Sequence, residues 1–381
     1  MGRTLLIASD YPPMVSGIAR SLYNFWKYLP RSKMIIAAPR VKGCDEFDAE
    51  AEMPVFRYST LLSYDIFSRS VNFISLFVFS LRLIGRYRIE KVVCGQPVSA
   101  GAIGLLLKKI FGTPYCVYVY GGERAKFRRF IGIIPLLKCI AANAEEVIAN
   151  SNYTADEYRG YGIGSIKITV ITPGVDTKVF TRPDDADSLK AELGLSGKRV
   201  LFTAARLSER KGHDLTILAM PEVIKEVPDC VYVIAGDGPR MGRLKGMVRE
   251  LRLEGRVIFT GFLNDERLTD YYKACDLFVM VNRETKGVET VEGFGTSFIE
   301  ASACGKPVIG GRSGGVEDAV VDNETGILVD PLNKDDISGA IIRILKDDVL
   351  AKRLGDNGRR RVERSFGWRT LSKKVEEVLF P

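Results

Sequence analysis

Short runs of β-branched and aliphatic residues recur along the chain, and they constrain its fold more than any other feature. Six of these runs lie in the first half, at residues 4–9, 33–38, 91–94, 115–120, 145–150 and 168–171. Six more follow in the second half, at residues 199–204, 231–236, 256–261, 276–281, 307–311 and 326–330. Longer segments separate most of the runs, a spacing typical of βαβ units and parallel sheets. We therefore predict an α/β protein with two Rossmann-like, doubly wound domains that face each other across a cleft.

The length of the chain also calls for more than one hydrophobic core. A chain of 381 residues is longer than a single core usually supports, and two domains are the ordinary solution. The segment from Pro173 to Lys198 combines prolines, glycines and an acidic cluster, as linkers often do. We predict a first domain at residues 1–178, a second at 179–365, and a C-terminal helix at 366–381 that packs back on the first domain.

Cysteine and histidine usage excludes several kinds of site. The seven cysteines are odd in number and form no C-x-x-C pair, which indicates a reducing compartment and argues against disulfides or a zinc site. The single histidine, His213, excludes a multi-histidine metal centre, and we interpret it as a helix-start residue rather than a catalyst. The first residues show no signal-peptide pattern, so a cytoplasmic location is expected.

Positive charge is concentrated in the first half. The first 180 residues carry 23 Lys and Arg against 14 Asp and Glu, whereas the whole chain has a net charge of only +8. An anionic partner is therefore expected for the first domain: a membrane surface, a phosphorylated acceptor or a nucleic acid. Nothing in this half resembles an aromatic stacking platform or a recognition helix, so we do not expect nucleic acid.

Two segments combine basic and apolar residues. The run from Ser70 to Leu81 lies between Arg69 and Arg82 and is too short to span a bilayer, which needs about 20 apolar residues. The segment 123–142 mixes several cations with Phe and Ile residues. Such a surface suits the interface of an anionic membrane. The alternative is an ordinary helix packed on the sheet with a solvated, charged end.

The most informative motif is EGFGTSFIE at residues 292–300, in which a glycine-rich turn runs into a helical pattern. Gly295 permits a backbone conformation with positive φ and a close approach of the chain. Thr296 or Ser297 is expected to cap the helix that follows. The first N–H groups of that helix, at the positive end of its dipole, would form an anion site.

The two glutamates of this motif are expected to contact different parts of a ligand. Glu292 precedes the turn, whereas Glu300 lies about one turn into the helix. An acid/base pair for glycoside hydrolysis would instead flank one bond, with carboxyl groups about 5–10 Å apart. The spacing suits a ligand with hydroxyl groups at both ends and phosphates between them. A nucleotide sugar has that shape.

Two cations follow the strand predicted at residues 199–204. Arg206 and Lys211 lie five residues apart, at the edge where a parallel sheet binds its ligands. Permanent cations at this edge suit a phosphate or a diphosphate, and two solvated surface cations are the alternative. Glycine-containing turns also follow the strands predicted at 231–236 and 256–261. For each of these turns a simple strand-to-helix connection is the alternative.

The second half resembles a known enzyme family almost continuously, and the first half resembles it in outline. Residues 292–320, the ARLSERKG segment at 205–212, GVDTKVF at 174–180 and NETGILV at 323–329 carry the resemblance. They are similar to the retaining nucleotide-sugar glycosyltransferases of family 4, also called glycosyltransferases group 1, which have the GT-B fold. The two-glutamate element combined with Arg206 and Lys211 is the specific part of the match.

The resemblance assigns donor-binding roles to residues of the second half. Arg206 and Lys211 would hold the donor diphosphate in place of a metal ion, so neither metal nor cofactor is expected. Glu300 would hold the ribose hydroxyls, and Glu292 the hydroxyls of the transferred sugar. We predict Glu292, Arg206 and Lys211 as the catalytic residues. Further donor contacts are expected from the backbone of Phe294, Gly295, Thr296 and Ser297 and from the turns at Gly236 and Phe262.

The resemblance also assigns two residues of the first half to the donor. Gly17, in the loop after the first strand, would approach the diphosphate from the first domain. Many relatives have two glycines there, whereas this chain has Ser16 and Gly17. The family often places a histidine near the donor sugar where this chain has Tyr120. Either Tyr120 makes that contact or the contact is missing.

The implied function is that of a retaining, metal-independent hexosyltransferase. It would move a hexose from a nucleotide-diphosphate sugar to a hydroxyl of a lipid-linked glycan or another cell-envelope glycoconjugate, bound by the first domain. We favour GDP-mannose as the donor, with UDP-glucose or UDP-N-acetylglucosamine as alternatives, and a soluble sugar phosphate is an alternative acceptor. A lipid-linked acceptor and the basic first half favour peripheral association with the inner face of the cell membrane. Two other functions stay open: a nucleotide-sugar epimerase of the same architecture and a non-catalytic subunit that binds a sugar nucleotide.

Overall fold

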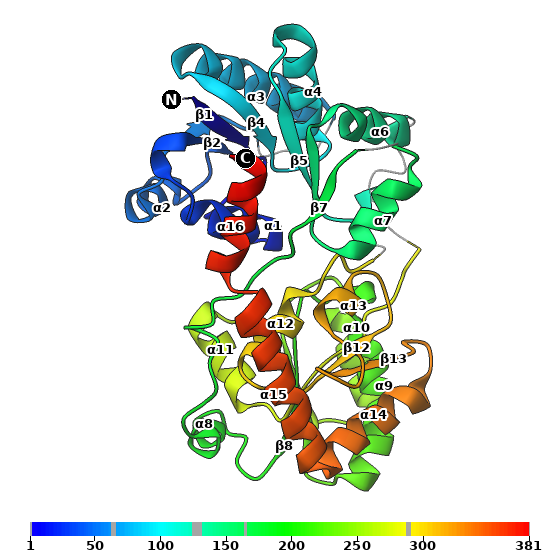
Figure 1. The fold of residues 1–381 in the computed structure, drawn as a ribbon. Helices are drawn as coiled ribbons and strands as arrows, with labels where there is room; N and C mark the ends of the chain where they lie inside the picture. Colours follow the sequence, from blue (N-terminus) through cyan, green and yellow to red (C-terminus); the bar gives the residue numbers. More distant parts are fainter. Residues whose placement is uncertain (1, 62–65, 124–131, 164–165, 287–290, 381) are drawn as a thin grey trace. The chain divides into compact units, whose positions relative to one another are not determined.

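The computed structural model describes residues 2–61, 66–123, 132–163, 166–286 and 291–380. The chain forms two compact units (Figure 1). Unit 1 comprises Met1–Pro173 together with Trp368–Pro381, and unit 2 comprises Gly174–Gly367. The chain therefore passes from one unit to the other twice.

Unit 1 is built around a seven-stranded parallel sheet with the strand order β3-β2-β1-β4-β5-β6-β7. Its strands are β1 (Arg3–Ile7), β2 (Met34–Pro39), β3 (Val55–Tyr58), β4 (Ile89–Cys94), β5 (Tyr115–Val119), β6 (Glu146–Ala149) and β7 (Ile168–Val170). Its helices are α1 (Gly17–Lys27), η1 (Arg31–Lys33), α2 (Cys44–Ala51), α3 (Ile66–Arg86), α4 (Ser99–Phe111), α6 (Ile133–Asn143), α7 (Asn152–Gly160) and α16 (Trp368–Leu379).

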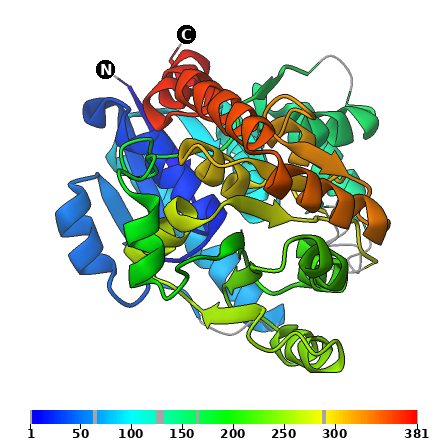
Figure 2. The ribbon, with the colours of Figure 1, turned by 90° about the horizontal axis from the view of Figure 1, so that it is seen from below.

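Successive strand residues of unit 1 point to opposite faces of the sheet, and this alternation builds two cores. Leu5 and Ile7 join the core beneath α3, α4, α6 and α7, whereas Leu6 joins the core beneath α1 and α16. The last helix, α16, lies beside α1 (Figure 1, Figure 2), and the ring of Trp368 packs edge-on against Phe25 at 5.3 Å. The end of the chain thus completes the core of the unit that contains its beginning.

Unit 2 contains a six-stranded parallel sheet with the strand order β10-β9-β8-β11-β12-β13. Its strands are β8 (Arg199–Ala204), β9 (Cys230–Ala235), β10 (Val257–Gly261), β11 (Leu277–Met280), β12 (Val308–Gly311) and β13 (Ile327–Val329). Its helices are α8 (Ala186–Glu192), η2 (Glu209–Lys211), α9 (His213–Glu226), α10 (Met241–Glu250), α11 (Asp265–Ala274), α12 (Thr296–Ala303), α13 (Val316–Ala319), α14 (Lys334–Lys346) and α15 (Asp348–Ser365).

Helices cover both faces of the unit 2 sheet. Residues of α9, α10 and α14 share one core with the sheet, and residues of α11, α12 and α13 share the other. All of the segment expected as a linker, residues 173–198, except Pro173 belongs to unit 2, and it contains α8. Buried Lys190 anchors this helix through an ion pair with Asp276 at 2.8 Å. The prediction of two Rossmann-like units with parallel sheets is confirmed.

In both sheets the strand order reverses at one place. The reversal lies between β1 and β4 in unit 1 and between β8 and β11 in unit 2. At such a point the loops that leave two neighbouring strands diverge, and α/β proteins bind their ligands in the crevice outside the carboxyl ends of those strands. The loops after β8 and β11 therefore form the edge of unit 2 at which a ligand is expected, called the ligand-binding edge below.

The two segments expected at a membrane surface differ in how far the structure describes them. The apolar run at residues 70–81 lies inside α3, which extends from Ile66 to Arg86. Among the helices that the structure describes, none combines the length and the apolar character needed to cross a bilayer. In the segment 123–142, residues 124–131 lie outside the described residues, and with them most of its cations.

Candidate active site

A buried charge cluster surrounds Glu292 in unit 2. Glu292 is only 9% exposed, and its Oε2 lies 2.6 Å from Nζ of Lys211. The guanidinium of Arg210 donates a hydrogen bond to the same oxygen, and Nδ2 of Asn282 donates to it at 3.2 Å. One carboxylate oxygen thus receives two cations and an amide. These four residues are called the Glu292 cluster below.

Close backbone packing fixes the turn that carries the two cations. Arg210 and Lys211 lie on η2, in the loop that leaves β8. The next residue, Gly212, has a φ of +68°, and a Cβ atom there would lie 1.8 Å from the carbonyl oxygen of Val281. Only glycine permits this conformation at such a short approach. The N–H of Arg283 also donates to the Arg210 carbonyl at 3.0 Å. The turn at η2 thus packs on the loop after β11 and is hydrogen-bonded to it, at the place where the strand order reverses.

The charges of the cluster keep Glu292 ionised. Burial alone would raise the pKa of Glu292, but Lys211 and Arg210 together outweigh it and hold the pKa below its ordinary value. At neutral pH this carboxylate therefore has no proton to donate. The contacts that Lys211, Arg210 and Asn282 make with this carboxylate all end on Oε2.

His213 lies two residues after Lys211 and is the first residue of α9, as expected from the sequence. It is only 2% exposed. Burial and then the charge of Lys211 lower its pKa to about 3, although Asp214 acts in the opposite direction. The imidazole is therefore neutral at physiological pH and is poorly suited to acid catalysis.

The helix after the glycine turn, α12, begins differently from the prediction. Gly295 is its N-cap residue, with a φ of +92°, and neither Thr296 nor Ser297 caps it. The Ser297 hydroxyl instead donates to the carbonyl of Ala204, at the end of β8, at 3.0 Å. A Cβ atom at position 295 would lie 2.6 Å from the ring of Phe298, so the turn requires glycine where a side-chain cap was expected. No side chain caps this end, and the N–H of Phe298 donates to the carbonyl of Gly295 at 3.0 Å. A helix N-terminus without a side-chain cap suits an anion.

Glu300, in the second turn of α12, is anchored by a different element. It is 7% exposed, and its Oε2 accepts a hydrogen bond from the hydroxyl of Tyr272 on α11 at 2.8 Å. The ring of Tyr272 is fully buried and lies edge-on to Phe202 at 5.1 Å. Burial and then the charge of Glu300 raise the pKa of Tyr272 well above its ordinary value, so the phenol stays a donor. The two glutamates of the motif are therefore held by separate parts of unit 2.

The remaining predicted residues of unit 2 follow the ends of neighbouring strands. Gly236, after β9, has a φ of +133°, and a Cβ atom there would lie 2.1 Å from the carbonyl oxygen of Ala205, so the turn packs on the loop that leaves β8. Arg206 lies in that loop and is exposed. Phe262, after β10, is 74% exposed. The side chain of Phe294 is buried in the core, so only its backbone can reach a ligand.

In unit 1, Gly17 is the first residue of α1. The hydroxyl of Ser16 caps this helix by accepting from the N–H of Ala19 at 3.0 Å. The same hydroxyl donates to Asp10 at 2.6 Å, which fixes the loop after β1. The structure thus places Gly17 at a capped helix N-terminus beside the reversal point of the first sheet.

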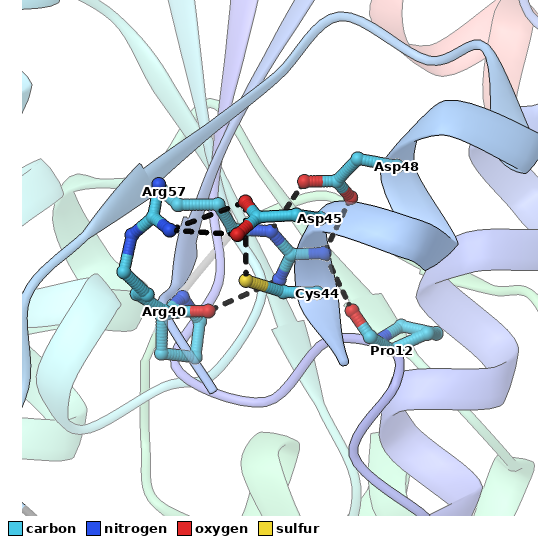
Figure 3. Close-up of polar contacts among 7 residues, drawn as sticks. Pro12, Arg40, Cys44, Asp45, Asp48 and Arg57 are labelled. Atoms are coloured by element: carbon cyan, nitrogen blue, oxygen red, sulfur yellow. Dashed lines mark hydrogen bonds and ion pairs between the residues drawn. The ribbon is translucent and has the colours of Figure 1, made fainter. Parts of the chain in front are cut away.

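A buried arginine holds the loop that leads to Gly17 (Figure 3). The side chain of Arg57 is 3% exposed and pairs with Asp48 at 2.6 Å. It also donates to the carbonyl oxygen of Pro12 at 2.7 Å. A second, exposed pair, Arg40 and Asp45 at 3.1 Å, lies next to it. The loop after β1 is therefore anchored by Arg57, which comes from β3.

Tyr120 follows β5 in unit 1. Its hydroxyl donates to the carbonyl of Gly95 at 2.9 Å, and its backbone N–H donates to Glu123 at 2.7 Å. Burial raises the pKa of Glu123 to about 7. Because the hydroxyl hydrogen of Tyr120 is bound within the protein, this residue can meet a ligand only as a hydrogen-bond acceptor.

Three residues that contact the predicted site were not identified from the sequence. Arg210 directly precedes Lys211. It could have been predicted as a partner of Glu292, because a buried carboxylate requires a nearby positive charge. Asn282 comes two residues after β11, at the reversal point of the sheet. Tyr272 has no comparable signal, because it lies on another helix, 28 residues before Glu300.

Two family models match the chain in succession. Residues 15–179 match the model described as Glycosyltransferase Family 4, and residues 185–361 match the model described as Glycosyl transferases group 1. The GDP-mannose-dependent alpha-(1-6)-phosphatidylinositol monomannoside mannosyltransferase of Mycolicibacterium smegmatis is 32% identical, over 98% of this chain and 97% of that protein. The chain belongs to glycosyltransferase family 4.

A second relative and a solved structure are also similar to the chain. The enzyme of the same description from Mycobacterium tuberculosis is 30% identical, over 100% of this chain and 98% of that protein. The solved structure of Anabaena HepE in complex with UDP matches with a TM-score of 0.84 at 22% identity, over 100% of this chain and 99% of that one. The likeness to HepE concerns the fold. This family 4 glycosyltransferase is a hexosyltransferase with the GT-B fold, and both predictions are confirmed.

Proposed function

We propose that this family 4 enzyme transfers mannose from GDP-mannose to a hydroxyl of a phosphatidylinositol-linked mannoside, with retention of configuration and without a metal ion. The Glu292 cluster at the ligand-binding edge of unit 2 carries the proposal. The mycobacterial relatives carry the choice of donor and acceptor, because their names give GDP-mannose and phosphatidylinositol monomannoside. Unit 2 binds the donor, and unit 1 binds the acceptor.

The donor diphosphate is held by positive charge at the ends of β8 and α12. Lys211 is buried beside the edge of the sheet, and Arg206 is exposed in the same loop. The uncapped N-terminus of α12 adds backbone N–H groups. Permanent cations at this place do the work of a metal ion, because they neutralise the charge that grows on the leaving diphosphate.

The two glutamates position the two ends of the donor. Glu292 accepts hydrogen bonds from hydroxyls of the mannose through Oε1, and Glu300 accepts them from the ribose. The depressed pKa of Glu292 supports a role as acceptor rather than acid. The acceptor hydroxyl then attacks the anomeric carbon from the face that the diphosphate leaves, and a phosphate oxygen takes its proton. This course retains the configuration and requires no side-chain base.

An exposed apolar surface of unit 1 supports binding of the acceptor at the inner face of the cell membrane. On α3, the side chains of Phe67, Ile74 and Val78 are 73%, 60% and 39% exposed, at the spacing of one helix face. Ile110 and Phe111, at the end of α4, are each 58% exposed. Large apolar side chains in such numbers suit insertion into the interface of a bilayer.

Calorimetric titration without metal, followed by a transfer assay in EDTA, tests the proposal. The purified protein is titrated with GDP, UDP and ADP and their hexose conjugates, with and without anionic vesicles. We expect GDP to bind and mannose to be transferred from GDP-mannose to phosphatidylinositol monomannoside in mixed micelles. An α-linked product by NMR supports retention, and a β-linked product contradicts it. Failure of GDP to bind under either condition would contradict the proposed donor, and epimerisation without transfer would favour the epimerase.

The Tyr272→Phe substitution should weaken GDP binding by about tenfold, because hydrogen bonds to charged groups contribute about 1.5 kcal/mol or more. The phenyl ring keeps its packing against Phe202, whereas the buried carboxylate of Glu300 loses its donor at 2.8 Å. Calorimetry with GDP measures the change. The matched control is Tyr271→Phe, which removes the hydroxyl of the neighbouring tyrosine, whose ring stacks on Phe202 at 5.6 Å. Equal affinities of the two variants would exclude Tyr272 as a support of the ribose site.

A further inference from the structure

Lys211 faces two anions if the proposed function holds, and it carries one positive charge. In the structure its Nζ lies 2.6 Å from Oε2 of Glu292. Under the proposed function it also binds the donor diphosphate. The three N–H donors of an ammonium group can contact both partners, but a single charge cannot balance a buried carboxylate and a diphosphate together. A second cation is therefore required next to Glu292.

Arg210 supplies that second charge. Its guanidinium donates to the oxygen that Lys211 also contacts, and its backbone is fixed by the N–H of Arg283 at 3.0 Å. Asn282 also contacts this oxygen, at 3.2 Å, but a neutral amide cannot balance its charge. The side chain of Arg283 pairs with Asp214 at 2.8 Å, so its charge balances the carboxylate of Asp214 and not that of Glu292.

We infer that Arg210 is a positioning residue that balances Glu292 and thereby makes the charge of Lys211 available to the donor diphosphate. The inference rests on the proposed function and deepens it. With Arg210 in place, the carboxylate stays ionised and correctly oriented beside the bound diphosphate. Without Arg210, Glu292 and the diphosphate compete for one ammonium group, because a buried charge that loses its partner is costly. Arg210 acts in this way without touching the donor.

The test compares GDP affinity in variants of the full-length protein by calorimetry. We expect Arg210→Met to weaken GDP binding about tenfold or more, since the carboxylate then competes for Lys211. Arg210→Lys keeps the charge and should stay within about threefold of the wild type. The decisive variant is Arg210→Met combined with Glu292→Gln. Removal of the competing charge should restore GDP affinity to within about threefold of Glu292→Gln alone, while mannose transfer remains lost.

Each other outcome overturns a distinct claim. An Arg210→Met variant that binds GDP like the wild type overturns the inference. Equal weakness of the single and the double variant also overturns it, because Arg210 would then contact GDP or maintain the fold. Thermal unfolding of each variant, with Arg249→Met on the exposed side of α10 as the matched control, separates a general loss of folding. If instead GDP fails to bind the wild type, or Lys211→Met binds it normally, the proposed donor site itself is wrong.

Discussion

Replacement of Lys211 by alanine should lower kcat for mannose transfer about 10²–10³-fold, the usual cost of removing one preorganised donor to a developing anion. Lys211 is held beside the ligand-binding edge before any substrate arrives, because Gly212 locks the turn against the loop after β11. Its charge therefore needs no reorganisation as the diphosphate leaves. A transfer assay at saturating GDP-mannose measures the loss. The same substitution at Arg206 should act in the same direction and range if it binds the same phosphates.

A surface lysine provides the matched control for this prediction. Lys225 lies on α9 and forms an exposed ion pair with Glu222 at 2.8 Å, so Lys225→Ala should leave kcat and stability nearly unchanged. Circular dichroism would show whether Lys211→Ala keeps the native fold. Turnover near that of the wild type in both Lys211→Ala and Arg206→Ala would exclude them as the diphosphate clamp.

Substitution of the two glutamates should separate transfer from nucleotide binding. Glu292→Ala should lower kcat about 10²-fold or more and leave GDP affinity within a few-fold, because its carboxylate orients only the sugar. Glu300→Ala should weaken GDP binding about 10–100-fold, the equivalent of about 1.5–3 kcal/mol for hydrogen bonds to a charged group. Calorimetry with GDP and the transfer assay are run on the same preparations, with Glu250→Ala on α10 as an exposed control. Identical losses in both assays would contradict this division of roles.

The cluster also gives Glu292 a defined effect on stability. Its pKa is depressed in the folded protein, since Lys211 and Arg210 outweigh burial. The unfolded chain, with an ordinary Glu pKa of about 4.3, therefore binds a proton more readily than the native protein does. The contribution of the cluster is fully present above that pH and is lost as the pH falls through the lower, folded pKa. Near neutral pH, small changes in pH therefore leave the contribution of the cluster to the free energy of unfolding unchanged.

The strand pattern was readable from the sequence because most strands are buried on both faces and carry β-branched runs. β3 was missed, since Val55–Tyr58 is a short edge strand that contains Arg57 and follows Pro54. One charged residue among only four argues against a strand when the residues that pack against it in the fold are not known. In the structure that arginine turns inward to hold Pro12 and Asp48.

The candidate site was readable only in part, for a related reason. Glu292, Glu300 and Lys211 stand in recognisable local patterns, and the structure buries all three. Their partners depend on contacts between distant segments, such as Tyr272 with Glu300 and Arg210 with Glu292. The N-cap at Gly295 was missed because the need for glycine arises from the ring of Phe298, which packs on the turn. The structural propensity of a residue can be read from its local sequence, whereas these features depend on contacts between two residues that the fold brings together.

The return of the last helix to unit 1 sets an order of assembly on the ribosome. Unit 2 is contiguous in the chain, so all of its strands and helices have been synthesised once Gly367 has left the tunnel. Unit 1 lacks Trp368, Leu371 and Val375, which fill its core, until α16 has also been synthesised. Domains of a nascent chain usually fold in order from the N-terminus. In this enzyme, unit 1 can complete its core only after all of unit 2 has been synthesised, so the last step of its folding departs from that order.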